Sequence, residues 1–342
     1  MNHGSTMPER RFLIIGCGSI GKRHLGNLLA AGVGEVTAFD VRADRALEVR
    51  SQFGVEVFTD LDSALKRRPH VALITAPTSL HVPLAEQSAE HGCHLLIEKP
   101  LSHSRDGVDR LLDLVRRKDL ATLVGCNLRF HPGLVAVKRL LEQGVVGRVV
   151  AARVEVGQYL PDWHPHEDYR QGYSARSDLG GGIILDAIHE IDYVRWLLGP
   201  VRSVACFADQ LSHLEIQTED TAALVLRFAE GTIGEVHLDY VQRVYSRTCH
   251  IIGDEGTVRW DYSAGEVRVY RAASKAWETV ANPGGWQPNQ MYVDELAHFV
   301  RCLDREERPT LDIFDAARVL DVALAAKESS MTGRVITFEG GM

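Results

Sequence analysis

The chain has 342 residues, long enough for two domains that each bury a core of their own. Apolar residues make up 45% and charged residues 25%, which excludes a disordered or collagen-like chain. Acidic residues outnumber basic ones, 46 to 38, and the formal net charge of -8 argues against binding to nucleic acid or anionic lipid. The sequence lacks an apolar signal core and any apolar run of about 18 residues, so we expect a cytoplasmic protein without a membrane span.

The first third of the chain alternates short apolar runs with helical periodicity, a pattern that predicts βαβ units around a parallel sheet. Glycines or prolines end most of these segments. The expected strands cover residues 12–15, 36–40, 55–57, 71–74, 94–97 and 122–125. The expected helices cover residues 19–31, 43–52, 79–91, 104–118 and 132–143.

The rhythm changes near residue 149 to period-two stretches, which predict a mostly antiparallel sheet. Its expected strands include residues 150–156, 221–228, 232–240 and 249–252. Helical patterns cover residues 183–198, 289–303 and 313–330. The sequence therefore predicts an α/β protein with a parallel-sheet domain at residues 1–128 and a second α/β domain at residues 129–342.

A glycine-rich turn, Gly16-Cys17-Gly18-Ser19-Ile20-Gly21, stands between the first expected strand and helix. In this context G-x-G-x-x-G predicts a pyrophosphate site at the helix N-terminus. Asp40 ends the second strand, where a carboxylate can accept hydrogen bonds from a ribose diol and would repel a 2'-phosphate. Arg42 could pair with that phosphate instead. We expect NAD, with NADP as the alternative.

Two further segments have residues suited to proton transfer. Lys99, in Glu98-Lys99-Pro100, follows a buried strand at the sheet edge where ligands bind, although a surface Glu/Lys pair is an equal reading. Asp186 and His189 fall on one face of the helix expected after Gly180-Gly181-Gly182, where the acid can orient the imidazole. A buried structural histidine is the alternative.

The six cysteines are dispersed without a C-x-x-C pair, and we expect them to be reduced. The pattern nearest to a metal site is His164-Pro165-His166, followed by Glu167 and Asp168. Two histidines that flank a proline in a polar loop are more often solvated than ligating, so no metal site is predicted.

The sequence resembles the glucose-fructose oxidoreductase, inositol dehydrogenase and rhizopine catabolism (Gfo/Idh/MocA) family over nearly its whole length. The resemblance rests on the residues from Gly16 to Gly21, Thr75-Ala76-Pro77-Thr78 with His81, Glu98-Lys99-Pro100, Asn127 with Arg129-Phe130-His131-Pro132, and the run GGGIILDAIHEIDYVRWLLG. It implies a Rossmann domain, a C-terminal domain whose open sheet packs against another subunit, and an active site between the domains. We therefore expect a homodimer or homotetramer.

The resemblance also implies roles for individual residues. Lys99 and His189 correspond to the family's proton-handling residues. Many members have an Asp four residues before the histidine, whereas here position 185 is Leu and the carboxylate is Asp186; Asp192 is the other candidate for orienting His189. The expected cofactor contacts are Gly16, Gly18, Ser19, Ile20, Gly21, Asp40, Arg42, Ala76, Pro77, Thr78, His81, Glu98, Lys99 and Asn127.

The substrate side of the sequence is rich in aromatic and guanidinium groups. Its Tyr159-Leu160-Pro161-Asp162-Trp163 and Asp168-Tyr169-Arg170 segments are similar to a branch of the family found near genes for bacterial surface sugars. Arginines 129, 153, 170 and 176 are suited to a phosphate or carboxylate, although some are simply solvated. The expected substrate contacts are Arg129, Tyr159, Trp163, Tyr169, Arg170, Asp186 and His189.

These observations predict an NAD(P)-dependent dehydrogenase that moves hydride between the nicotinamide and a secondary alcohol or ketone of a sugar, sugar derivative or cyclitol. An NAD-dependent glycosidase of the same superfamily would share the glycines but catalyse net hydrolysis. A non-catalytic dinucleotide sensor would share them without the proton-handling residues, and the presence of both Lys99 and His189 argues against it.

Overall fold

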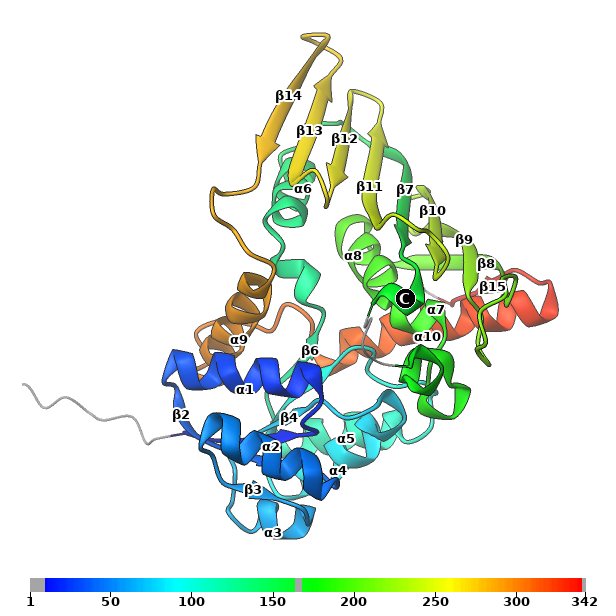
Figure 1. Cartoon of the computed structure of the whole chain (residues 1–342). Coiled ribbons are helices and arrows are strands. Elements are labelled where there is room, and N and C mark those ends of the chain that lie inside the picture. Colours follow the sequence, from blue (N-terminus) through cyan, green and yellow to red (C-terminus); the bar gives the residue numbers. More distant parts are fainter. Residues whose placement is uncertain (1–9, 164–167, 340–342) are drawn as a thin grey trace, which may run out of the picture. The chain divides into compact units, whose positions relative to one another are not determined.

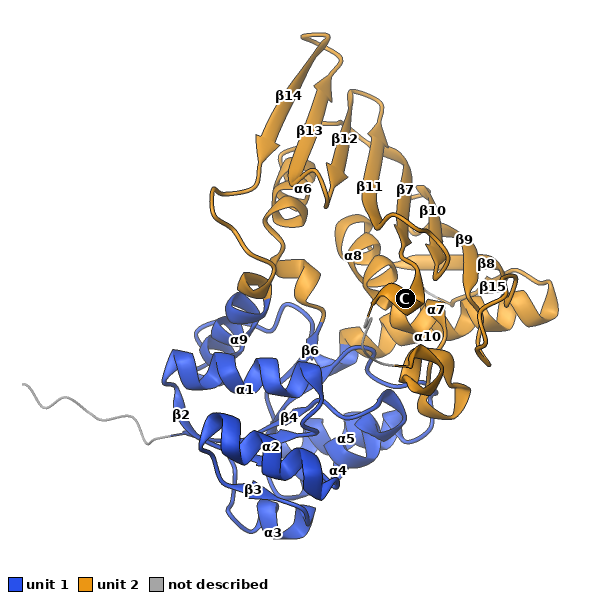
Figure 2. Cartoon of the chain, viewed as in Figure 1, with its two compact units in different colours: residues 1–125, 292–314 blue, residues 126–291, 315–342 orange. Residues whose placement is uncertain are grey.

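The computed structural model describes residues 10–163 and 168–339 (Figure 1). The His164-Pro165-His166 stretch and Glu167 lie outside these residues. The chain forms two compact units: residues 1–125 with 292–314, and residues 126–291 with 315–342 (Figure 2). Within the described ranges, no helix combines the length and the apolar character needed to cross a membrane.

Unit 1 contains a six-stranded sheet in the order β3-β2-β1-β4-β5-β6. All its paired strands are parallel, which confirms the predicted doubly wound sheet. The order reverses at β1, and such a switch point opens a crevice at the carboxyl ends of the strands. The strands are β1 (Arg10–Ile15), β2 (Gly34–Phe39), β3 (Val57–Phe58), β4 (Val71–Ile74), β5 (His94–Glu98) and β6 (Thr122–Gly125).

The helices of unit 1 include one from far along the chain. Those of the N-terminal part are α1 (Ser19–Ala31), α2 (Ala43–Phe53), α3 (Leu61–Leu65), α4 (His81–Glu90) and α5 (Val108–Lys118), with the short 3-10 helix η1 (Thr78–Leu80). Helix α9 (Asn289–Leu303) joins them, because its Leu296 and Phe299 share one apolar core with Leu25 and Leu28 of α1. The observed units therefore differ from the predicted division at residue 128: residues 292–314 belong to unit 1.

Unit 2 contains a nine-stranded sheet in the order β14-β13-β12-β11-β7-β10-β9-β8-β15, which Figure 1 displays strand by strand. Among the strand pairs of the described residues in this sheet, β7 with β10 is parallel and the others are antiparallel, which confirms the predicted mostly antiparallel sheet. The strands are β7 (Val149–Gly157), β8 (Val201–Asp209), β9 (Thr221–Phe228), β10 (Ile233–Asp239), β11 (Ser246–Gly253), β12 (Gly256–Asp261), β13 (Glu266–Arg271), β14 (Ala276–Ala281) and β15 (Ile336–Thr337).

Helices cover one face of this sheet. Helix α6 (Pro132–Glu142) packs against β12 and β13, and α8 (Ile188–Leu198) packs against β7 and β10. The opposite face bears exposed apolar side chains, among them Phe207, Val225 and Ile233. The remaining helical elements of unit 2 are α7 (Ile183–Asp186), α10 (Ile313–Thr332), which begins in unit 1, and the 3-10 helices η2 (Asn127–Phe130), η3 (Leu160–Asp162), η4 (Tyr169–Gln171), η5 (Tyr173–Ala175) and η6 (Ser177–Leu179).

The single helix predicted over residues 183–198 is wrong. The helix is interrupted at Ala187, whose φ of -90° and ψ of 30° are not helical, and α7 and α8 form instead. Gly182, which immediately precedes α7, has a φ of +108°, a backbone conformation that residues other than glycine rarely adopt. Asp186 therefore ends one helix, while His189 lies in the first turn of the next.

Candidate active site

The three glycines of the turn after β1 differ in what requires them. A Cβ on Gly16, whose φ is +103°, would lie 2.8 Å from the backbone nitrogen of Ala76, and one on Gly21 would lie 2.0 Å from the Gly16 carbonyl oxygen. These two glycines are required by the protein's own packing. A Cβ on Gly18 would meet nothing within 4 Å, so the missing side chain there leaves space for a ligand at the start of α1.

The start of α1 is suited to an anion. Its N-cap is Gly18, which has no side chain to accept the first N–H groups of the helix. Those donors and the helix dipole favour a phosphate. Thr75 supports the turn from β4, since its hydroxyl donates to the Gly16 carbonyl oxygen at 2.6 Å. The predicted contacts Ser19 and Ile20 form the first residues of this helix.

Asp40 lies beside the same turn and is buried, with 4% of its surface exposed. Its carboxylate accepts hydrogen bonds from the backbone N–H groups of Cys17, at 2.8 Å, and Arg42, at 2.9 Å. The Arg42 side chain is directed to another carboxylate, since its Nε donates to Asp44 at 3.1 Å. The acid at the end of β2 is thus fixed next to the glycine turn, while the exposed guanidinium pairs locally.

His81 joins two loops at the carboxyl edge of the sheet. One ring nitrogen lies 2.8 Å from the Ala76 carbonyl oxygen and the other lies 2.8 Å from that of Pro100. Burial lowers the pKa of His81, although both carbonyls favour the protonated ring. The ring thereby ties the Ala76-Pro77-Thr78 segment to the loop after β5. Asn127, another predicted cofactor contact, is buried in η2 of unit 2.

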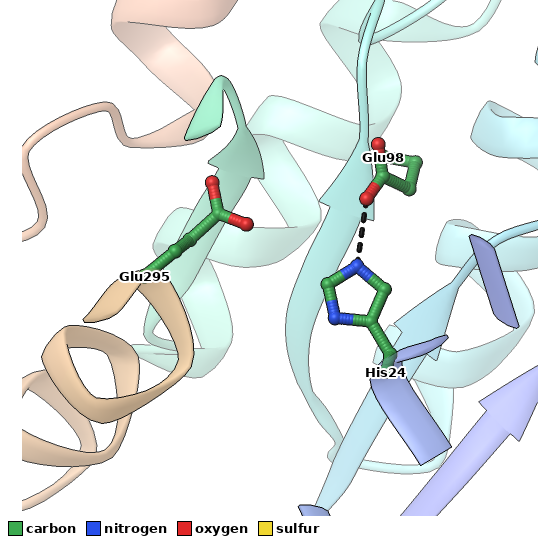
Figure 3. Close-up of side chains that lie close together, drawn as sticks. All are labelled: His24, Glu98 and Glu295. Carbon is green, nitrogen blue, oxygen red and sulfur yellow. Dashed lines mark hydrogen bonds and ion pairs between the residues drawn. The ribbon is translucent and has the colours of Figure 1, made fainter. Parts of the chain in front are cut away.

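Lys99 is half-buried and follows β5 directly. Its backbone N–H donates to the carboxylate of Glu98 at 3.2 Å. The same carboxylate accepts from Nε2 of His24 at 2.7 Å, and Glu295 of α9 lies close by (Figure 3). The sequence analysis missed His24 and Glu295, because a helical pattern does not reveal which distant strand end or helix a side chain meets.

His189 lies in the first turn of α8 and has 9% of its surface exposed. The next residue, Glu190, is fully buried and forms an ion pair with Arg247 of β11, with Nε and Oε1 2.9 Å apart. The charge of Glu190 raises the pKa of Arg247 above its usual range even though burial opposes it. This ion pair anchors the beginning of α8 to the sheet.

Asp186 is the acceptor of three hydroxyl groups. One carboxylate oxygen accepts from Tyr173, and the other accepts from Ser174 at 2.7 Å and Tyr240 at 3.0 Å. Burial, with the Asp186 charge, raises the pKa of Tyr240 well above 10. These bonds link α7 to η5 and to the residue that follows β10, and favour a structural role for the carboxylate.

Asp192 pairs with Arg129. The two form a buried bidentate ion pair, with Nε to Oδ2 at 2.9 Å and Nη2 to Oδ1 at 2.7 Å, and Arg129 is only 4% exposed. The structure thus places this guanidinium against Asp192 inside unit 2, and the substrate contact of Arg129 stays a prediction. It likewise gives Asp192 a partner other than His189.

The other predicted substrate residues fall into separate environments. Trp163 packs against Tyr240, with ring centroids 5.4 Å apart, which brings it near Asp186. The Tyr159 ring lies under the guanidinium of Arg243, 3.7 Å away. Arg170 pairs with Asp168 and Glu215, and the Tyr169 hydroxyl accepts from the backbone of Glu215. Arg153 pairs with Glu235, and Arg176 pairs with Asp178.

Two family models match successive parts of the chain. The oxidoreductase family with the NAD-binding Rossmann fold matches residues 10–126, and the GFO/IDH/MocA C-terminal domain matches residues 134–259. The myo-inositol 2-dehydrogenase of Thermotoga maritima is 28% identical over 347 residues, which cover 96% of this chain and 98% of that protein.

Solved structures share the fold over nearly the whole chain. Levoglucosan dehydrogenase, in complex with NADH and levoglucosan, has a TM-score of 0.87 at 22% identity and covers 96% of this chain and 98% of its own. The WlbA dehydrogenase from Bordetella pertussis, in complex with NADH and UDP-GlcNAcA, has a TM-score of 0.82 at 24% identity and covers 96% and 99%. With its parallel dinucleotide-type sheet followed by the open nine-stranded sheet, the chain belongs to the Gfo/Idh/MocA family of oxidoreductases.

Proposed function

We propose that this protein is an NAD-dependent dehydrogenase that interconverts a secondary alcohol and a ketone on a sugar, sugar derivative or cyclitol. The observation that carries the proposal is the open space over Gly18 at the start of α1, next to the fixed carboxylate of Asp40. Relatives named as inositol and levoglucosan dehydrogenases support the substrate class. The WlbA complex extends that class to a nucleotide-linked sugar.

The residues present fit a dinucleotide. The amide groups at the start of α1 would hold its pyrophosphate, and Asp40 would accept hydrogen bonds from the adenosine ribose diol. The carboxylate favours NAD, because a 2'-phosphate would meet its negative charge, and Arg42 is already paired with Asp44. NAD, when bound, supplies the hydride acceptor for alcohol oxidation.

Lys99 and His189 are the proposed proton-handling residues. His189 takes the hydroxyl proton as the carbon loses hydride, and returns a proton to the oxygen in the reverse direction. Lys99 would share this proton transfer, and its ammonium form would stabilise negative charge that develops on the oxygen. Three hydroxyl groups donate to Asp186 and fix α7, the helix that precedes α8 in the chain. We therefore propose a supporting role for this carboxylate.

We also propose that the open face of the nine-stranded sheet packs against a second copy of the chain. Phe207, Val225 and Ile233 are exposed on this face beside charged side chains such as Arg227 and Glu235, and a second copy would cover these apolar groups.

The activity test is a panel of free, amino, acidic and nucleotide-linked sugars together with inositols, assayed by nicotinamide absorbance with NAD and NADP. Oxidation of at least one member with NAD is the expected result. Hydrolysis of a glycoside without net change in absorbance would instead identify a glycosidase, and binding of NAD without turnover of any member would contradict the proposed activity.

A further inference from the structure

Three buried ionisable side chains meet in unit 1 beneath the strand end that carries Lys99. They are His24 of α1, Glu98 of β5 and Glu295 of α9, and one side-chain nitrogen or oxygen atom of each lies within 4.8 Å of those of the other two (Figure 3). His24 and Glu295 are fully buried, and Glu98 is 7% exposed. Burial of charged groups is unfavourable unless they are paired, so this arrangement requires a physical reason.

The carboxylate of Glu98 bridges α1 and the peptide of Lys99. Oε1 accepts from Nε2 of His24 at 2.7 Å, and Oε2 accepts from the Lys99 N–H at 3.2 Å. Gly125 of the neighbouring strand provides room for it, since a Cβ there would lie 3.2 Å from the Glu98 carboxyl carbon. The strand end is therefore held through one side chain with a hydrogen bond on either oxygen.

Tyr292 of the same helix as Glu295 lies beside this cluster. Tyr292 of α9 packs edge-on against His24, with ring centroids 5.8 Å apart. Burial raises the pKa of Tyr292; the charges of Glu98 and Glu295 raise it further, and those of Arg23 and Lys99 lower it. Two acids and two bases thus act on the Tyr292 hydroxyl.

One histidine and two carboxylates are also a ligand set that divalent metals accept. The geometry favours hydrogen bonding instead. His24 Nε2 and Glu98 Oε1 are 2.7 Å apart, the distance of a charge-assisted N–H···O bond. The second oxygen of Glu98 already accepts a hydrogen bond from the Lys99 backbone amide. A metal would have to break the first of these bonds.

We propose that His24 is a positioning residue for Lys99 that acts through Glu98. Glu295 is the third ionisable side chain buried beside them. His24 fixes the Glu98 carboxylate, and the carboxylate fixes the Lys99 peptide. The inference rests on the proposed function of Lys99. It assigns a role to the first helix beyond phosphate binding.

The test compares His24→Leu, which cannot donate a hydrogen bond, with His24→Gln, whose amide can. Leu25→Val is the matched control, because Leu25 is buried on the same helix turn but packs only in the apolar core. Hydrogen exchange of the peptide that contains Glu98 and Lys99 reports the positioning without any substrate. We expect faster exchange there in His24→Leu, near-normal exchange in His24→Gln, and no local change in Leu25→Val.

Turnover with the best sugar of the panel provides the second readout. We expect His24→Leu to lower kcat by about 10- to 100-fold, as a small displacement of a catalytic group does, with little change in the KM for NAD and partial rescue in His24→Gln. Added to Lys99→Met, His24→Leu should lower kcat no further, because its effect acts through Lys99.

Distinct results would overturn the positioning role and the proposed function. Normal exchange and turnover in His24→Leu beside an inactive Lys99→Met would remove only the positioning role. Full turnover in Lys99→Met would instead refute the function proposed for the lysine. Binding of one Mn²⁺ or Zn²⁺ per chain that His24→Gln abolishes would overturn the hydrogen-bonded bridge in favour of a metal site.

Discussion

Lys99 and His189 are held by their neighbours in different ways. The Lys99 peptide is bonded to Glu98, whereas His189 follows a helix break and precedes the buried Glu190–Arg247 ion pair. Lys99→Met and His189→Ala should each lower turnover by roughly 100- to 10,000-fold, the usual contribution of general acid-base catalysis. NAD affinity should change much less in His189→Ala, since the expected pyrophosphate and ribose contacts lie at the glycine turn and Asp40.

Activity and thermal unfolding, measured on the same preparations, separate catalysis from folding. Replacement of the exposed His213 by Ala is the matched histidine control and should leave turnover unchanged. A folded His189→Ala variant with full activity would remove His189 from the mechanism.

Asp40 should determine cofactor choice. Asp40→Ala is expected to weaken NAD binding more than NADP binding, because it removes both the acceptor for the ribose diol and the charge that repels a 2'-phosphate. Titration calorimetry with both dinucleotides checks the difference, and Arg42→Ala serves as the comparison. Tenfold tighter binding of NADP than of NAD by the unaltered protein would contradict the assignment.

His131 should make folding sensitive to acid. Burial, with the nearby Arg247 charge, lowers its pKa from 6.5 to about 4, and its Nδ1 accepts a hydrogen bond from the Gly133 N–H at 3.0 Å. The unfolded chain binds a proton at this histidine between these values while the folded protein does not. Its contribution to stability is therefore complete above pH 6.5 and decreases by about 1.4 kcal/mol per pH unit as the pH falls towards 4.

Urea unfolding between pH 4 and 7 measures this contribution against a variant. The Asn side chain of His131→Asn can still cap α6 but does not titrate. Between pH 4 and 6.5 the slope of the unfolding free energy against pH should therefore be smaller in this variant, by about 1.4 kcal/mol per pH unit. Equal slopes in the two proteins would show that His131 titrates normally in the folded state.

At the level of elements, two glycines of the turn after β1 should respond in opposite ways to replacement by alanine. Gly21→Ala should reduce folded yield, because the added Cβ would overlap the Gly16 carbonyl oxygen. Gly18→Ala should fold normally, because its Cβ meets no protein atom within 4 Å, and yet bind NAD about tenfold more weakly, which corresponds to about 1.4 kcal/mol. Thermal unfolding and NAD titration on both variants check the contrast; unchanged NAD affinity in Gly18→Ala would place the pyrophosphate elsewhere.

The sequence predicted local elements better than their partners. Apolar runs and glycines marked the parallel strands, since buried strands and tight turns have strong local signatures. The break at Ala187 was missed, because neither Gly nor Pro stands at that position. Arg129 and Asp192 each have charges suited to a ligand, and only the packing of η2 with α8 reveals that they pair with each other.

At the level of the whole molecule, the open sheet face should determine assembly. Val225→Glu places a second carboxylate opposite Glu235 on this face and should shift the protein towards monomers, whereas Leu47→Glu, an equally drastic change on exposed α2, should not. Light scattering at micromolar concentration distinguishes the cases. A monomeric unaltered protein would refute the proposed interface.

The sequence did not reveal that residues 292–314 belong to the first unit. The helix over residues 289–303 was predicted at its observed position, but an amphipathic pattern does not specify which core it covers. Sequence order favoured the second domain, whereas Leu296 and Phe299 pack in the core of the first unit.

This return of the chain has a consequence for synthesis on the ribosome. Unit 1 begins with the N-terminal strand, yet it lacks its last segment until residues 292–314 have been made. During translation the apolar side chains of α1 that share a core with α9 lack these partners until residues 126–291 have been synthesised. Growth of the nascent chain therefore cannot complete the two units one after the other: the nucleotide-binding unit is complete only after residue 314 has been made, when residues 126–291 of the other unit already exist.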